Sequence, residues 1–143
     1  MITKQNKIKL TFITLVLDLI LFHIYWNQKL TKTDEIYVQS IFLIHFLLYI
    51  SLWFSFYKLI DILHVCLFLS ILCFFFIDSF QIQVLLLGLM FTIQLLWMWE
   101  DNQCIMNTNG TVFHGVGGKI FHTLQFIYFT LSCIYLGKKL KVD

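Results

Sequence analysis

The sequence contains no alanine, arginine or proline, and it carries little charge. Only 13% of its 143 residues are Asp, Glu, Lys or Arg, whereas 59% are hydrophobic. Soluble domains contain about 25% charged residues, and so small a charged fraction as this one cannot cover a protein surface in water. The composition therefore excludes a soluble enzyme, a disordered tail and a secreted disulfide scaffold. It predicts an integral membrane protein.

The missing residue types also bear on the origin of the gene. Codons for Ala, Pro and Arg are mostly GC-rich, whereas Lys, Ile and Phe have AT-rich codons. The composition is typical of an AT-biased genome, as in an organelle, a protist, a large virus or a reduced bacterium. We therefore expect the mitochondrial inner membrane, with another AT-rich organelle, a viral membrane or a bacterial membrane as alternatives. The net charge of +2 is too small to indicate a nucleic-acid partner.

Several apolar stretches are long enough to cross a hydrocarbon core of about 30 Å, which takes about 20 residues of helix. The apolar block over 59–99 is too long for one helix, and Asp78-Ser79 marks the break within it. Tyr and Trp, which favour membrane interfaces, occur near many of the expected ends. The sequence predicts one all-α membrane domain over 1–143, with spans at 8–26, 36–57, 59–77, 82–99 and 120–136.

The connection between the second and third spans is short and only weakly polar. Between Ser55 and Asp61, the strongly polar side chains are those of Lys58 and Asp61, and there is no glycine. We expect a tight helical hairpin here. A four-span arrangement, with one segment lying in the interface, is the alternative.

The lysines do not establish an orientation in the membrane. With the N-terminus inside, one group of five lysines lies inside and another group of five outside, so the positive-inside rule gives no preference. Such a tie suits a chain that partner subunits hold in place. The two groups are Lys4, Lys7, Lys9, Lys58 and Lys119, and Lys29, Lys32, Lys138, Lys139 and Lys141.

The longest polar stretch, 100–119, contains a turn signal. Asn109-Gly110 lies between two short runs that favour strands, and Asn-Gly is typical of two-residue hairpin turns. We therefore expect a short β-hairpin near 104–114 at the membrane surface.

Helices in lipid associate through small residues and interhelical hydrogen bonds. Alanine is absent and Gly88 is the only glycine within the predicted spans, so Ser, Thr and Cys must allow close packing. Without a Cys-x-x-Cys motif, disulfide exchange is not expected. Gln94 is a lone polar group that we expect to bond to another helix. The predicted packing residues are Ser51 and Ser55, then Cys66, Ser70 and Cys73, and finally Thr123, Thr130, Cys133 and Gly137.

Ionisable residues at membrane depth are costly, and Asp18 and His45 are the clearest pair. Their positions in the first and second spans give them matched depths, which would allow a hydrogen bond or an ion pair. We expect a pair that fixes the register of the two helices. A proton relay is the alternative, because histidine titrates near neutral pH.

His64 and His122 form a second possible pair. Two histidines at one depth on facing helices could ligate a b-type haem, but no arginine is present to bind its propionates. We expect interfacial side chains, and therefore no cofactor and no metal. Motifs for catalysis are also missing, so no catalytic residue is predicted.

These observations predict a non-catalytic, accessory subunit of a multi-subunit membrane complex, with an energy-transducing organellar complex as the first expectation. Its partners would be other membrane subunits and bound lipids. The alternatives are a small proton-coupled transporter or channel component that uses Asp18 and His45, and a bis-histidine haem protein that uses His64 and His122.

Overall fold

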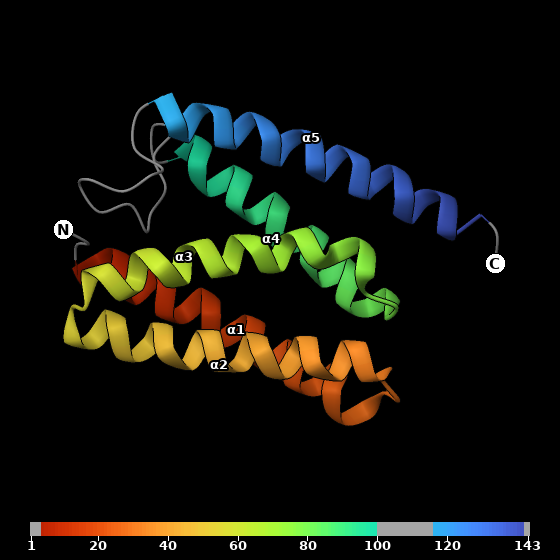
Figure 1. Ribbon diagram of the computed structural model, residues 1–143, viewed down its shortest axis with the longest axis horizontal. Coiled ribbons are helices and arrows are strands. Elements are labelled where there is room, and N and C mark those ends of the chain that lie inside the picture. Colours follow the sequence, from red (N-terminus) through yellow and green to blue (C-terminus); the bar gives the residue numbers. More distant parts are fainter. Residues whose placement is uncertain (1–3, 100–115, 142–143) are drawn as a thin grey trace.

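The computed structural model describes residues 4–99 and 116–141, without the side chains of 97, 99 and 116–122. Consecutive helices of its first part run back and forth along one axis, and the last helix lies along one side of the bundle (Figure 1). The elements are α1 (Lys4–Asn27), α2 (Lys32–Phe54), α3 (Tyr57–Leu72), the 3-10 helix η1 (Cys73–Phe76), α4 (Phe80–Trp99) and α5 (Val116–Lys139).

The all-helical class is confirmed for the described residues, and three helices are long and apolar enough to cross a membrane. These are α1, α2 and the continuous segment Tyr57–Phe76. The apolar part of α4, Phe80–Leu96, is shorter. The helices α4 and α5 include the other two predicted segments, 82–99 and 120–136. That all five segments cross the membrane stays a prediction. The hairpin expected near 104–114 lies outside the described residues.

The helix ends differ from the predicted span ends for local reasons. The polar residues before the first two predicted spans are themselves helical, so α1 and α2 begin earlier than predicted. Thr31 caps α2 by accepting a hydrogen bond from the Asp34 N–H at 3.3 Å. The predicted end of the second span at residue 57 is wrong, because Ser55 adopts φ 59° and ends α2. The N–H groups of Ser55 and Phe56 both donate to the Ser51 carbonyl, which closes the helix.

The core lies along α2. This helix packs against α1 and α3, while α4 packs against α5 and also contacts α1. One buried cluster, which includes Val38, Phe74, Ile82 and Met90, draws on all five α-helices. A second cluster joins α1, α2 and α3 near the α2–α3 turn. At that end, the Lys7 ammonium donates to the Ser55 hydroxyl at 2.7 Å.

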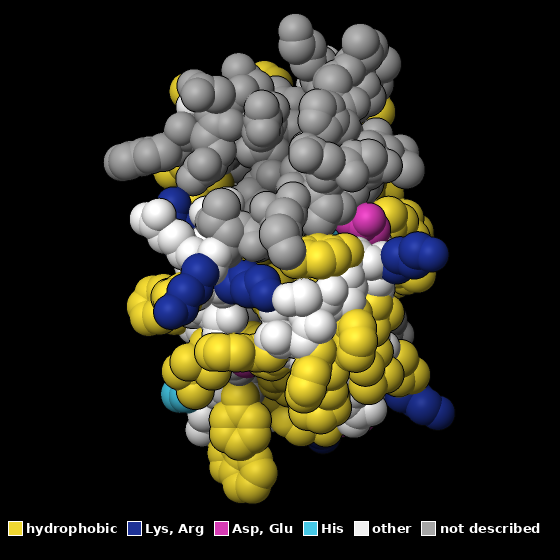
Figure 2. Space-filling model, turned by 90° about the vertical axis from the view of Figure 1, so that its left-hand side faces the viewer, with side chains coloured by type: hydrophobic (Ala, Val, Ile, Leu, Met, Phe, Trp, Pro, Cys, Tyr) yellow, Lys and Arg dark blue, Asp and Glu magenta, His cyan; other side chains and the backbone are white. Residues whose placement is uncertain are grey.

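The outer surface is strongly apolar. Only 22% of the α1 span, 39% of the α2 span and 22% of the Tyr57–Phe76 span are buried. Figure 2, which looks at the left-hand end of Figure 1, shows hydrophobic side chains over much of the described surface, between separate lysines. Soluble monomers rarely expose apolar patches of this extent. The surface therefore supports an integral membrane protein.

The junction of α3 and η1 gathers side chains from three other helices. Where the chain tightens into a 3-10 helix, carbonyls lose their regular helical donors. The Tyr37 hydroxyl donates to the Ser70 carbonyl at 3.3 Å, and the Tyr128 hydroxyl donates to the Leu72 carbonyl at 2.7 Å. Gln83 Nε2 donates to the Phe74 carbonyl at 3.3 Å. These bonds tie α2, α5 and α4 to the same short stretch.

The Tyr128 bond is testable by removing one hydroxyl. Tyr128→Phe keeps the ring but leaves the Leu72 carbonyl without this donor, so we expect a loss of about 1 kcal/mol of stability. Thermal unfolding in detergent, followed by circular dichroism, measures the change. Tyr135→Phe is the matched control, because the Tyr135 ring packs edge-on against Phe74 and Phe75. Equal losses in the two variants would contradict a special role for the Tyr128 hydroxyl.

Candidate functional site

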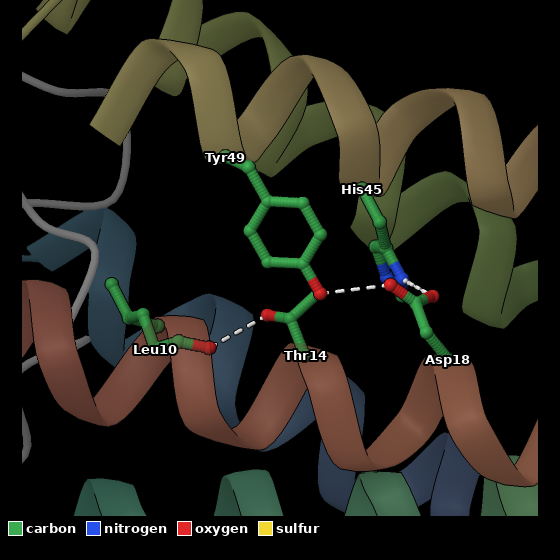
Figure 3. A network of polar contacts seen from close by, with 5 residues as sticks. All are labelled: Leu10, Thr14, Asp18, His45 and Tyr49. Carbon is green, nitrogen blue, oxygen red and sulfur yellow. Dashed lines mark hydrogen bonds and ion pairs between the residues drawn. The ribbon is translucent and has the colours of Figure 1, made fainter. Parts of the chain in front are cut away.

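Asp18 and His45, paired from the sequence, lie in contact between α1 and α2. The Nδ1 atom of His45 is 2.6 Å from Asp18 Oδ1. The hydroxyl of Tyr49, one turn further along α2, donates to Asp18 Oδ2 at 2.8 Å. Figure 3 shows both side chains of α2 pointing at the one carboxyl group of α1. Because an ionised carboxylate only accepts hydrogen bonds, this contact then requires a proton on His45 Nδ1.

We call Asp18, His45 and Tyr49 the triad, and it lies well inside α1 and α2. Asp18 is about 13 Å from the Asn27 end of α1, at about 1.5 Å rise per residue. Side-chain exposure is 6% for His45 and 20% for Asp18. Polar groups at such depth need internal partners, and each carboxylate oxygen here has one. The arrangement can fix the register of α1 against α2, and it also contains the acid and base groups of a proton relay.

The hydrogen bonds of the triad do not extend along α1 to Thr14. The hydroxyl of Thr14, one turn before Asp18, donates to the Leu10 carbonyl at 2.7 Å (Figure 3). The hydroxyl proton of Thr14 is therefore used in a bond to the helix backbone and not in a bond to Asp18.

Tyr49 is the residue of the triad that the sequence did not predict. Its spacing of four residues from His45, which places the two side chains on one helix face, was the available signal.

A second polar cluster, which the sequence analysis did not predict, lies where α2 begins and α4 begins. Asp34 is 1% exposed, and its carboxylate oxygens accept hydrogen bonds from the N–H groups of Asp78 (3.0 Å) and Ser79 (2.9 Å). Ser79 directly precedes α4. Asp34 therefore provides acceptors and negative charge at the start of a helix of another part of the chain.

The C-terminal end of α5 joins the same cluster. Lys139 Nζ donates to the Asp78 carbonyl and to Gln83 Oε1, each at 3.1 Å. Gln83 is fully buried, and its Nε2 donates to the Ile77 carbonyl at 2.8 Å. We call Asp34, Asp78, Ser79, Gln83 and Lys139 the end cluster. It links α2, α4 and α5, and Asp78-Ser79, expected only as a break, is its centre.

The predicted packing residues of α2 and α3 have different environments. Ser51 is fully buried and donates to the Leu47 carbonyl, whereas Ser55 lies in the turn beyond α2. Cys66, Ser70 and Cys73 are half-buried on α3 and at its end. Of these, Ser70 takes part directly in packing, because its carbonyl accepts the Tyr37 hydroxyl.

The packed face of α5 differs from the predicted stripe. Thr123, Thr130 and Gly137 are exposed, and Cys133 is half-buried. The face that meets the bundle instead carries the Tyr128 hydroxyl bond and the buried residues Gln125, Ser132 and Leu136. The bond of Tyr128 and the contact of Lys139 set this rotation of the helix, so its small residues point outward.

The possible haem pair stays a prediction. His64 is half-buried on α3, and the side chain of His122 lies outside the described residues. Within the described part of the chain, no group of three or more His, Cys, Asp or Glu residues could hold a metal ion.

Comparison of the chain with protein-family models, curated proteins and solved structures finds no match.

The end cluster can be tested at Asp34. Asp34→Ala removes the acceptor of two backbone N–H groups, and we expect a loss of about 2–3 kcal/mol, because charge-assisted bonds are lost and buried donors stay unpaired. Thermal unfolding in detergent measures it. Glu35→Ala is the control, since Glu35 is exposed in the same helical turn and should change stability by under about 0.5 kcal/mol. Similar effects of the two substitutions would refute the role of Asp34 in holding the segment before α4.

Proposed function

We propose that this chain is a non-catalytic, structural subunit of a larger membrane complex. The observation that carries the proposal is the outward stripe of α5, formed by Thr123, Thr130 and Gly137. A Cβ atom added at Gly137 would meet no atom within 4 Å. Small residues on an exposed helix face allow a second helix to approach closely in lipid.

The internal polar groups support the same proposal. The triad joins α1 to α2, and the end cluster joins α2, α4 and α5. The carboxyl groups of Asp18 and Asp34 are thus both used to hold separate helices together. The AT-biased composition favours an energy-transducing organellar complex, in which other membrane subunits and lipids cover the outer faces.

The α5 stripe gives the direct test. Thr130→Trp places a large ring in the stripe and should release the chain from its complex, because it prevents close helix approach. Native electrophoresis after extraction in mild detergent shows the change as a shift to the mass of the free chain. Leu131→Trp is the matched control, as Leu131 is 51% exposed on an adjacent side of α5. A wild-type chain that is a stable monomer in its native membrane extract would refute the proposal.

Proton transfer is the second candidate function, and the triad favours it. A carboxyl group, an imidazole and a phenol are in hydrogen-bond contact within the membrane, and such groups are typical of proton relays. Asp18 is the more exposed of the two residues in the ion pair, at 20% against 6%.

Asp18→Asn separates the two candidates. As a relay residue, Asp18 must exchange a proton, which an amide cannot do, so we expect proton flux into dye-loaded liposomes to fall at least tenfold while assembly persists. As a register-fixing residue, Asp18 uses both of its carboxylate oxygens, whereas an amide keeps only one acceptor, so the substitution then lowers the yield of complex. Leu19→Asn, at an exposed neighbouring position, controls for the added amide.

A further inference from the structure

Two buried glutamines in the helix pair α4–α5 have amide atoms without a hydrogen-bond partner among the described residues. Gln94 is 8% exposed and Gln125 is 2% exposed. The atoms concerned are Gln94 Nε2, Gln125 Nε2 and Gln125 Oε1. Burying an amide without a partner is strongly unfavourable, above all where no bulk water is near. Native proteins leave few such groups unsatisfied, so these three atoms require an explanation.

The register of α4 and α5 places the two amides at the same depth. The helices are antiparallel (Figure 1), and the rings of Phe91 and Phe129 stack with centroids 6.3 Å apart. Gln94 follows Phe91 by three residues, and Gln125 precedes Phe129 by four. At about 1.5 Å rise per residue, both lie about 5–6 Å from the ring pair, toward the same end of the bundle.

Both glutamines also lie on the packed faces of their helices. Besides Ile82, buried residues recur on α4 at a spacing of three or four, at Gln83, Leu86, Met90 and Gln94. Among the described side chains of α5, the buried ones are Gln125, Ser132 and Leu136. The unpaired amide atoms therefore lie on the sides of α4 and α5 that face the bundle.

The three atoms match the hydrogen-bonding capacity of one water molecule. Two are donors and one is an acceptor. Flipping the Gln125 amide does not change this count, and flipping the Gln94 amide gives one donor and two acceptors, which a single water can also satisfy. A direct bond from Gln94 Nε2 to Gln125 Oε1 would leave Gln125 Nε2 unpaired. One water can accept from both Nε2 groups and donate to Oε1, and buried waters typically make about three hydrogen bonds. We propose that Gln94 and Gln125 hold a buried water molecule between α4 and α5.

Infrared spectroscopy of the full chain in lipid tests this site. The wild type should show a sharp O–H band of an isolated water that shifts in H₂¹⁸O, and both Gln94→Leu and Gln125→Leu should lose it. Gln81→Leu is the control, since Gln81 is exposed on α4, and it should keep the band. A band that survives both substitutions, or is missing from the wild type, would overturn the proposal.

Thermal unfolding gives a second measurement. Each single leucine variant should lower Tm by a few degrees, because the other amide loses its shared partner. The double variant should lose no more than one single variant, because no unpaired amide remains. Additive losses would overturn the shared site. A high-resolution map of the wild type with the two amides bonded directly and no solvent between them would do the same, whichever variants fold.

Discussion

The structure depends on one constraint, which is that a polar group inside a membrane must find its hydrogen-bond partner within the protein. The α3–η1 junction shows the constraint most clearly. The regular α-helical pattern ends there, and Tyr37, Tyr128 and Gln83 donate from three other helices to the Ser70, Leu72 and Phe74 carbonyls. A local irregularity in one helix thereby becomes the point at which the bundle is held together.

The triad and the end cluster apply the same constraint to charged side chains. Asp18 accepts from two side chains of α2, whereas Asp34 accepts from two backbone N–H groups before α4. The bonds of Asp18 and those of Asp34 support different roles. The bonds of Asp34 hold the two residues that directly precede α4, which is a structural task. Asp18 instead contacts an imidazole and a phenol, both of which can transfer protons, so the triad supports a chemical role as well as a structural one.

The sequence predicted the elements better than it predicted their rotations. Long apolar runs identified each α-helix of the described residues, and Asp78-Ser79 identified the break between η1 and α4. Depth alone paired Asp18 with His45 in the positions where they meet. The end of α2 was wrong because a left-handed Ser55 leaves no mark in hydropathy. The role of Asp34 was missed because its partners are N–H groups far along the chain, and nothing in a single sequence specifies them.

The rotation of α5 could not be predicted for a related reason. Amphipathic helices reveal their buried side through their pattern, but a membrane helix that is apolar all round has no such preferred side. Its few polar atoms then decide its rotation, and on α5 the Tyr128 hydroxyl and the Lys139 ammonium direct one face inward. The stripe of Thr123, Thr130 and Gly137 is left outside by that choice. In the proposed assembly this outward stripe is where a partner helix approaches, because small side chains allow close packing in lipid, and the stripe can be recognised only once the internal hydrogen bonds are known.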